Sequence, residues 1–273
     1  MNDLKALIIF LSQYDLTNSK MRQIIDSLGD KPSIKTFKKT NLVKNKVLTD
    51  VAYNKMLAGA DETMVKTFVT NQANRGINIT TIDDEDFPEK LKDIDDAPLI
   101  LYYMGDLNLA SSPSLSVVGT RKPTSYGKVV TEKLTRDVAS AGIVIVSGLA
   151  YGIDSISHRK CLEVGGKTIA VLGGGFDHIY PVEHQSLAME IAEKGLLLSE
   201  YRPKRSATKY TFPIRNRIIA ALGDGVLITE ATVKSGTIHT KDFALDYGKN
   251  IYAVPGNIDS LNSELTNEII KRG

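Results

Sequence analysis

The chain reads LSVVGTRKPTSYGKVVTEKLTRDVASAGIVIVSGLAYGIDSISHRKCLEVGGKTIAVLGGG from Leu115 to Gly175. Short apolar runs in this stretch end in glycine or small polar residues, and the segments between them carry apolar residues at helical spacing. The apolar runs are continuous, which indicates strands that are buried on both faces. Alternation of such strands with helices predicts a parallel sheet covered by helices.

The same pattern continues toward the C-terminus. The predicted strands are 115–119, 143–148, 168–173, 196–200, 226–229 and 251–256. The helices predicted between them are 126–140, 153–164, 183–194, 213–222 and 236–247. We therefore expect an α/β protein with an extended Rossmann-like fold, in which a mostly parallel sheet has helices on both faces, preceded by a small helical N-terminal domain.

The N-terminal part of the chain has a different pattern. Residues 4–28 and 47–75 carry apolar residues at helical spacing. Acidic clusters at 83–86 and 93–96 then flank two prolines and lead into the extended run LILYYMG. The expected organisation is a small helical domain at 1–75, a connecting segment at 76–114 and the Rossmann-like domain at 115–273.

Composition excludes several classes of protein. The 273 residues are 42% hydrophobic and 24% charged, as in an ordinary globular protein. No apolar run is long enough for a membrane-spanning helix, and MNDLKALIIF lacks the features of a signal peptide. Cys161 is the only cysteine, and the four histidines have no metal-ligand spacing. We expect a cytoplasmic protein without a membrane segment, a metal or another cofactor.

Positive charge is concentrated in one short segment. Six basic residues fall between positions 202 and 217 with no acidic residue among them: Arg202, Lys204, Arg205, Lys209, Arg215 and Arg217. Such a run attracts polyanions, of which nucleic acid is the commonest large one. The interleaved Tyr201, Tyr210 and Phe212 are either stacking platforms for unpaired bases or core aromatics at a helix start.

Two of these arginines cannot face the same ligand. Pro213 suits the first turn of a helix, which places Arg215 and Arg217 in its opening turns, about 200° apart around the axis. If one arginine faces the ligand, the other points away from it. Two alternatives stay open for these arginines: contact with a ligand, or pairing of one of them with Glu200 or Glu230.

Two nucleotide-binding motifs fail on inspection. Gly173-Gly174-Gly175 follows a predicted strand, but the third glycine of a dinucleotide fingerprint would fall at His178. Gly166-Lys167-Thr168 precedes a strand, and Cys161 stands where a P-loop needs glycine. Neither a nicotinamide cofactor nor ATP bound by a P-loop is expected.

Three short segments at predicted strand ends suit phosphate groups. In the first, Gly119 is followed by Arg121 and Lys122, whose cations can pair with phosphate oxygens. The turns that begin at Ser147-Gly148 and at Lys234-Ser235-Gly236-Thr237 each lead into a helix whose N–H groups could hold an anion. In each segment the glycine could equally serve a tight turn and the hydroxyl a helix cap. Because carboxyl ends of parallel strands meet at one edge, we expect the three to share an anion site.

Catalytic groups are sparse. Asp154 and His158 lie four residues apart on one helix face, either as an acid–base pair or as a helix cap beside a hydrogen-bonded core histidine. Glu200 and Glu230 are the only obvious carboxylates at the strand edge. We therefore expect binding without covalent chemistry, and no catalytic residue.

Together these segments resemble the DNA-processing protein A family, also called DprA or Smf. The resemblance runs from about Phe87 to Gly273 and rests on SVVGTRKPTSYG, SGLAYGIDSISH, GGKTIAVLGGGFDHIYP, SEYRPKRSATKYTFPIRNRIIAAL, TEATVKSGTIHT and YAVPGNI. It implies a homodimeric protein that binds single-stranded DNA, and we expect this binding to be independent of sequence. The resemblance also implies that it delivers the RecA recombinase onto incoming DNA in natural transformation.

The resemblance and the residue patterns together give the candidate site. The candidate DNA- or phosphate-binding residues are Gly119, Arg121, Lys122, Ser147, Gly148, Lys204, Arg205, Lys209, Arg215, Asn216, Arg217, Lys234, Ser235, Gly236, Thr237 and Thr240. The candidate base-stacking residues are Tyr210 and Phe212.

The alternative is a Rossmann-like enzyme that processes nucleotides, similar to the phosphoribohydrolases that activate cytokinins. Those enzymes carry a Pro-Gly-Gly-x-Gly-Thr-x-x-Glu motif, whereas residues 230–240 here contain one glycine and no glutamate after Thr237 at the required spacing. A mediator binds oligonucleotides far better than mononucleotides, and an enzyme of this kind releases a free base.

Overall fold

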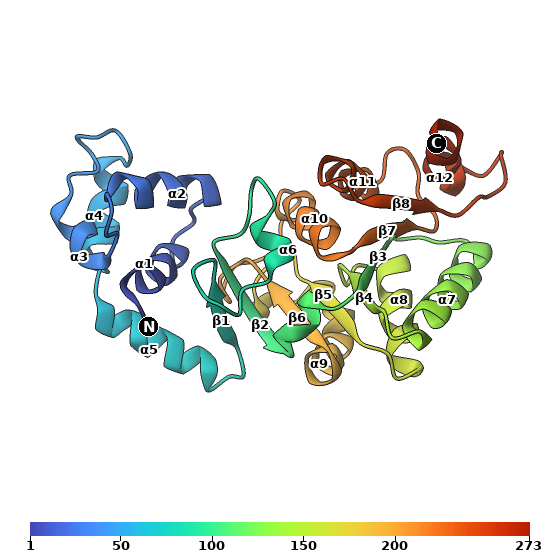
Figure 1. Ribbon diagram of the computed structural model, residues 1–273, viewed down its shortest axis with the longest axis horizontal. Coiled ribbons are helices and arrows are strands. Elements are labelled where there is room, and N and C mark those ends of the chain that lie inside the picture. The colour runs from blue at the N-terminus through green and yellow to red at the C-terminus, as the bar shows by residue number, and fades with distance from the viewer. The chain divides into compact units, whose positions relative to one another are not determined.

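The computed structural model describes residues 1–273 and contains two compact units. The smaller unit comprises residues 1–87 and 95–102, and the larger comprises residues 88–94 and 103–273 (Figure 1). The expected connecting segment at 76–114 is thus divided between the two. None of the helices has the length and apolar character needed to cross a bilayer.

The smaller unit is a helical cluster built around its first helix. Its helices are α1 (Asp3–Ser12), α2 (Asn18–Ser27), α3 (Ile34–Lys39), α4 (Asp50–Ala58) and α5 (Glu62–Ala73). Leu7, Ile9 and Leu11 of α1 are fully buried, so most of this apolar helix is core. The Phe10 ring packs edge-on against Phe37 of α3, with centroids 5.3 Å apart.

Two elements of this unit differ from the sequence prediction. The helix α3 was not expected, although Ser33 and Thr36 form a capping box at its start. The strand β1 (Asn78–Thr81) lies in the segment expected to be a connection. The strand β2 (Ile100–Gly105) corresponds to the predicted extended run, and its last three residues belong to the larger unit.

The larger unit is built on a parallel sheet. Six of its strands pair in parallel in the order β6-β5-β4-β3-β7-β8. At its centre Ser116 of β3 lies between Val146 and Val226 of the neighbouring strands. The strands are β3 (Ser114–Val118), β4 (Val144–Ser147), β5 (Thr168–Val171), β6 (Leu196–Ser199), β7 (Gly225–Ile228) and β8 (Asn250–Ala253).

Helices cover both faces of this sheet. The helices α7 (Ser125–Ser140), α8 (Ile153–Glu163) and α9 (Gln185–Lys194) pack side by side on one face (Figure 1). The helices α10 (Thr211–Leu222) and α11 (Thr237–Asp246) pack together on the other. The unit also contains α6 (Glu89–Lys92), α12 (Glu264–Arg272) and four 3-10 turns, η1 (Leu107–Ser111), η2 (Phe176–His178), η3 (Val182–His184) and η4 (Leu261–Ser263).

The predicted Rossmann-like architecture is confirmed. Each of the six strands predicted from Leu115 onward is present, and β4, β5, β6 and β7 are buried along their whole length. This burial explains why their sequences are continuous apolar runs. The predicted helices differ from the observed ones by no more than two residues at either end, which is the usual uncertainty of a helix boundary.

The strand order creates one special position. The chain moves outward from β3 through β4 and β5 to β6, and then crosses by α10 to β7 on the other side of β3. The connections after β3 and after β7 therefore diverge, which leaves a crevice between the carboxyl ends of these two strands. Open α/β sheets bind their ligands at such a switch point.

Candidate functional site

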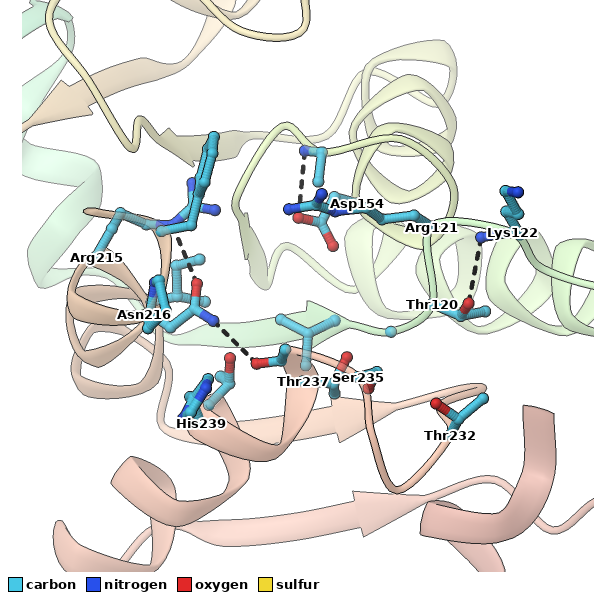
Figure 2. Close-up of a pocket in the computed structure, with 18 of the residues that line it drawn as sticks. Thr120, Arg121, Lys122, Asp154, Arg215, Asn216, Thr232, Ser235, Thr237 and His239 are labelled. Atoms are coloured by element: carbon cyan, nitrogen blue, oxygen red, sulfur yellow. Dashed lines mark hydrogen bonds between the residues drawn. The ribbon is translucent and has the colours of Figure 1, made fainter. Parts of the chain in front are cut away.

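A hollow of about 720 Å³ lies at this switch point. Its walls come from the segments that follow β3, β4 and β7 and from the start of α10, so elements far apart in sequence meet there (Figure 2). The lining residues are Val118, Gly119, Thr120, Arg121, Lys122, Ala150, Asp154, Lys209, Phe212, Pro213, Arg215, Asn216, Ile219, Thr232, Ser235, Gly236, Thr237, His239, Thr240 and Asn262.

The deepest cation of the hollow is Arg215. Its side chain is only 4% exposed. Its Nη1 donates to the carbonyl oxygen of Gly148 after β4, at 2.7 Å, and to that of Val171 at the end of β5. Its Nε donates to Oδ1 of Asn216 at 3.1 Å. The guanidinium therefore ties two strand ends to α10, and burial lowers its pKa to about 10.

Two glycines make room for this arrangement. A Cβ atom on Gly148 would lie 2.6 Å from Nη2 of Arg215. A Cβ atom on Gly173 would lie 2.6 Å from the Phe212 ring. Gly148 was predicted to bind phosphate. Its position against Arg215 gives a structural reason for the absence of a side chain there.

The triple glycine after β5 supports the basic segment. The carbonyl oxygen of Arg205 accepts a hydrogen bond from the N–H of Gly175 at 2.7 Å. A Cβ atom on Gly174 would lie 2.6 Å from the nitrogen of Ala207, and one on Gly175 would lie 2.0 Å from the oxygen of Arg202. Glycine at these positions lets the backbone of residues 202–207 lie directly against the end of β5.

The N-terminus of α7 already holds a carboxylate. Glu230 is buried, and its carboxylate accepts hydrogen bonds from the N–H of Thr124 at 2.8 Å and from the Thr124 hydroxyl at 2.6 Å. A Cβ atom on Gly127 would collide with this carboxylate. Negative charge at a helix N-terminus is favourable, so Glu230 occupies the position that a phosphate would otherwise take.

Asp154, in the first turn of α8, places a carboxylate beside the turn that precedes this helix. Its carboxylate accepts a hydrogen bond from the N–H of Ala150 at 3.3 Å, and the first helical N–H, that of Ile153, donates to the carbonyl oxygen of Thr120. Burial raises the pKa of Asp154, and the neighbouring Arg215 and Arg121 oppose that shift. The turn after β4 was expected to hold a phosphate, and the N–H groups of Ala150 and Ile153 there have partners within the protein.

The third N-terminus, that of α11, remains open. No side chain caps it, and Gly236 stands at the cap position. Ser235 lines the hollow, and its hydroxyl oxygen is buried without a hydrogen-bond partner. The amide of Asn216 donates to the carbonyl oxygen of Gly236 at 3.3 Å, which fixes this turn relative to α10. The N–H groups of Ile238 and His239 donate to the carbonyl oxygens of Ser235 and Gly236. The N–H of Thr237, which lines the hollow, is therefore the donor that this helix start offers to an anion there.

Exposed cations face this helix start. Arg121 and Lys122 follow β3 on one side of the hollow, and Ser235 and Thr237 lie on the other (Figure 2). The guanidinium carbon of Arg121 is 5.5 Å from the centre of the Phe212 ring, and that of Arg215 is 5.9 Å away. Both distances allow cation–π attraction, so Phe212 helps to hold Arg121 in place.

Arg217 has a different environment. It does not line the hollow, is 1% exposed and forms a salt bridge with Glu200 at the end of β6. The two arginines do point in different directions, as the helical angle indicated. The alternative in which one of them pairs with Glu200 is the one observed.

The remaining predicted residues lie outside the lining of the hollow. Ser147 is a buried strand residue whose hydroxyl donates to the carbonyl oxygen of Val117 at 2.6 Å. Lys204 and Lys234 are exposed, and Arg205 is partly exposed. Tyr210 is exposed beside Lys209, whose Nζ is 5.1 Å from the ring centre. Tyr201 is partly buried, and its hydroxyl donates to the carbonyl oxygen of Thr211.

Several lining residues were not predicted. Thr120 follows a predicted glycine and precedes a predicted arginine, so its position in the turn was the available signal. Asn262 donates to the carbonyl oxygen of Lys122 at 3.0 Å and supports that turn from a distant segment. Thr232 and His239 flank the KSGT turn. Only the three-dimensional structure brings Asn262 to the site.

Asp154 and His158 are not bonded to each other. His158 is fully buried, and its Nδ1 lies 2.7 Å from the Thr168 hydroxyl. Burial lowers its pKa to about 3, so this imidazole stays neutral near pH 7. The pair is a helix-start carboxylate beside a hydrogen-bonded core histidine.

Comparisons with known proteins connect this geometry to one family. Residues 78–273 match the family model of DNA recombination-mediator protein A. The chain is 44% identical over 185 residues to DNA processing protein DprA of Bacillus subtilis, which covers 67% of this chain and 62% of that protein. It is 41% identical over 190 residues to DprA of Streptococcus pneumoniae, covering 70% and 67%. The chain thus spans roughly half to two thirds of the length of these and the other first curated relatives.

Comparison with solved structures also relates this chain to DNA processing protein A. The structure of DNA processing protein A from Streptococcus pneumoniae aligns with a TM-score of 0.83 at 32% identity, over 100% of this chain and 94% of that one. A structure of the Helicobacter pylori protein, which concerns its single-stranded DNA binding mode, aligns with a TM-score of 0.65 at 36% identity, over 71% and 88%.

The buried salt bridge between Arg217 and Glu200 can be tested by a double-mutant cycle. Arg217→Met should lower the free energy of unfolding by about 3–5 kcal/mol, because it removes a cation that pairs with the buried Glu200 carboxylate. The double variant Glu200→Gln/Arg217→Met should be clearly more stable than the sum of the single variants predicts. Urea unfolding monitored by circular dichroism measures all four proteins. A single variant within about 1 kcal/mol of the parent would show that the pair has no such structural role.

Proposed function

Since the chain belongs to the DNA recombination-mediator protein A family, we propose that it binds single-stranded DNA without sequence preference and acts as a recombination mediator. In this proposal it delivers a RecA recombinase onto DNA entering the cell by natural transformation. It acts as a homodimer in the cytoplasm and performs no covalent chemistry. The family relation supports the recombination role, and the chemistry of the hollow supports the binding of phosphate groups.

One observation carries the DNA-binding part of the proposal. The uncapped N-terminus of α11 and the exposed cations Arg121 and Lys122 face the same hollow. Backbone N–H groups and a guanidinium fork match phosphate oxygens, and neither reads base identity. A strand held in this way is bound through its backbone, which agrees with binding of any sequence.

The proposal assigns the predicted residues to three roles. Arg121, Lys122, Lys209 and the Ser235–Thr237 turn contact phosphates in the hollow, with Thr240 beside that turn. Lys204, Arg205 and Lys234 extend the positive surface beyond it. Gly119, Ser147, Gly148, Arg215, Asn216 and Arg217 shape and support the site from within the protein.

The alternative enzyme has less support from this site. Glu230, one of the carboxylates at the strand edge, faces the N-terminus of α7 and is held there by Thr124. Asp154 is the carboxylate that lines the hollow, and it lies beside two arginines. Release of a free base from a nucleotide incubated with the protein would favour the enzyme.

Arg121 provides the direct test of the phosphate site. Arg121→Ala should weaken binding of a fluorescent oligothymidylate by about 10- to 150-fold, since a hydrogen bond to a charged group contributes about 1.5–3 kcal/mol. The slope of log affinity against log salt should also fall by about 0.7 for each phosphate that the variant no longer neutralises. Fluorescence anisotropy across a salt series measures both quantities.

Arg136→Ala is the matched control for that experiment. Arg136 is an exposed arginine of the same unit, and its position in the second half of α7 places it toward the opposite edge of the sheet. Its replacement removes the same charge and should leave the affinity within about twofold and the salt slope unchanged. Equal losses in the two variants would mean that only net charge matters and would contradict a site at Arg121.

The position of Asp154 in the hollow leads us to predict that the affinity for DNA depends on pH, in a definite direction. Its carboxylate repels phosphate when ionised, so affinity should rise as pH falls through its raised pKa, by at most about tenfold per pH unit for one proton. Asp154→Asn should bind more tightly than the parent above that pKa and should lose this dependence. His239 also lines the hollow, so both proteins are compared in a His239→Gln background. An unchanged pH profile in Asp154→Asn would exclude Asp154 as the titrating group.

A further inference from the structure

A second, smaller hollow lies beside the phosphate site and plays no part in the function proposed above. Its volume is about 290 Å³, close to the lower end of the range of roughly 300–1,000 Å³ for small-ligand pockets. It is formed by the segment after β5 and by the end of the basic segment. Its lining residues are Phe176, Asp177, His178, Ile179, Tyr180, Val182, Gln185, Ser206 and Ala207.

Tyr180 connects the two hollows. Tyr180 is 49% exposed, so its ring is accessible to a ligand. Its ring centre is 5.6 Å from that of Phe212, with the ring planes inclined at 52°. Phe212 lines the phosphate site and contacts the guanidinium of Arg121. A continuous path of Arg121, Phe212 and Tyr180 therefore leads from one hollow to the other.

The chemistry of the smaller hollow differs from that of the larger. No lysine or arginine lines it, and Asp177 does, so it is unsuited to phosphate. Phe176, Ile179 and Val182 supply apolar surface, while Gln185 and Ser206 supply hydrogen-bonding groups. Aromatic and aliphatic side chains with a few polar groups suit a planar heteroaromatic ring that has a polar edge.

The walls are held in place before any ligand arrives. The N–H of Asp177 donates to the carbonyl oxygen of Pro203 at 2.9 Å, and that of Gly175 donates to the carbonyl oxygen of Arg205 at 2.7 Å. These bonds join the two segments that form the hollow. A ligand that enters it meets a largely formed site and loses less affinity to ordering of the protein.

We propose that this second hollow receives one unstacked nucleobase of the bound strand, with Tyr180 as the side chain on which the base stacks. The inference rests on the proposed function, because the strand is the one whose phosphates lie on Arg121 and the α11 turn. It adds a base subsite at a residue that sequence analysis did not select. Stacking on a tyrosine tolerates any base, so it is compatible with binding of any sequence.

The test compares two strands that share a backbone. The first is an oligothymidylate, and the second is a strand of equal length in which every position is abasic. The ratio of affinities for the two measures what the bases contribute. In Tyr180→Leu this ratio should fall by about 5- to 150-fold, the effect of losing one base–aromatic stack, while affinity for the abasic strand stays the same. Tyr180→Phe keeps the ring and should retain the ratio of the parent.

Tyr252→Leu is the matched control. Tyr252 is 52% exposed and lies within β8, the last strand on the other side of the sheet. It should leave both affinities unchanged, and circular dichroism establishes that the variants are folded. Photocrosslinking of an iodouracil-substituted strand should place a covalent link at Tyr180 in the parent.

The possible failures can be told apart. An unchanged ratio in Tyr180→Leu, with salt-dependent binding intact, overturns the base subsite and leaves the proposed function standing. A parent protein that binds neither strand overturns the proposed function and the subsite with it. Equal loss of affinity for both strands in Tyr180→Leu would mean that Tyr180 supports the phosphate site, and it would also overturn the base subsite.

Discussion

The buried guanidinium of Arg215 is the interaction on which the site depends. It binds carbonyl oxygens at the ends of β4 and β5 and reaches the start of α11 through Asn216. Because a buried charge is costly unless it is well bonded, this group holds its neighbours in one arrangement. The absence of a side chain at Gly148 follows from its position against that guanidinium.

The carboxylates of Glu230 and Asp154 limit the places at the sheet edge that can receive an anion. Parallel strands followed by helices bring several positive helix N-termini to one edge of the sheet. Glu230 occupies the start of α7, and Asp154 occupies the turn before α8. The start of α11 is left without a cap, and Arg121 lies across the hollow from it. Of these three helix starts, that of α11 is the one beside which no carboxylate is bonded.

The fold was largely predictable because burial on both faces makes the strands of this sheet continuous apolar runs. The segment containing Arg215 and Arg217 was recognisable as basic, and their angle on α10 showed that one of them must turn away. Which of the two turns away depends on the position of Glu200. The sequence alone does not show how close Glu200 lies to α10 in space. Gly173, Gly174 and Gly175 excluded a dinucleotide fingerprint, but their role under the basic segment requires the contact with residues 202–207. Tyr180 gave no periodic or charge signal, so only its exposure and its contact with Phe212 identify it.

A crystal structure with a short oligothymidylate tests the central claim most directly, which is that a strand lies across the switch point on a site built around Arg215. We predict phosphate oxygens on the Arg121 guanidinium and at the N–H of Thr237, the first residue of α11, with Arg215 still bonded to the carbonyl oxygen of Gly148. A strand bound along another face, or an Arg215 side chain that has left the strand ends to hold a phosphate, would contradict it.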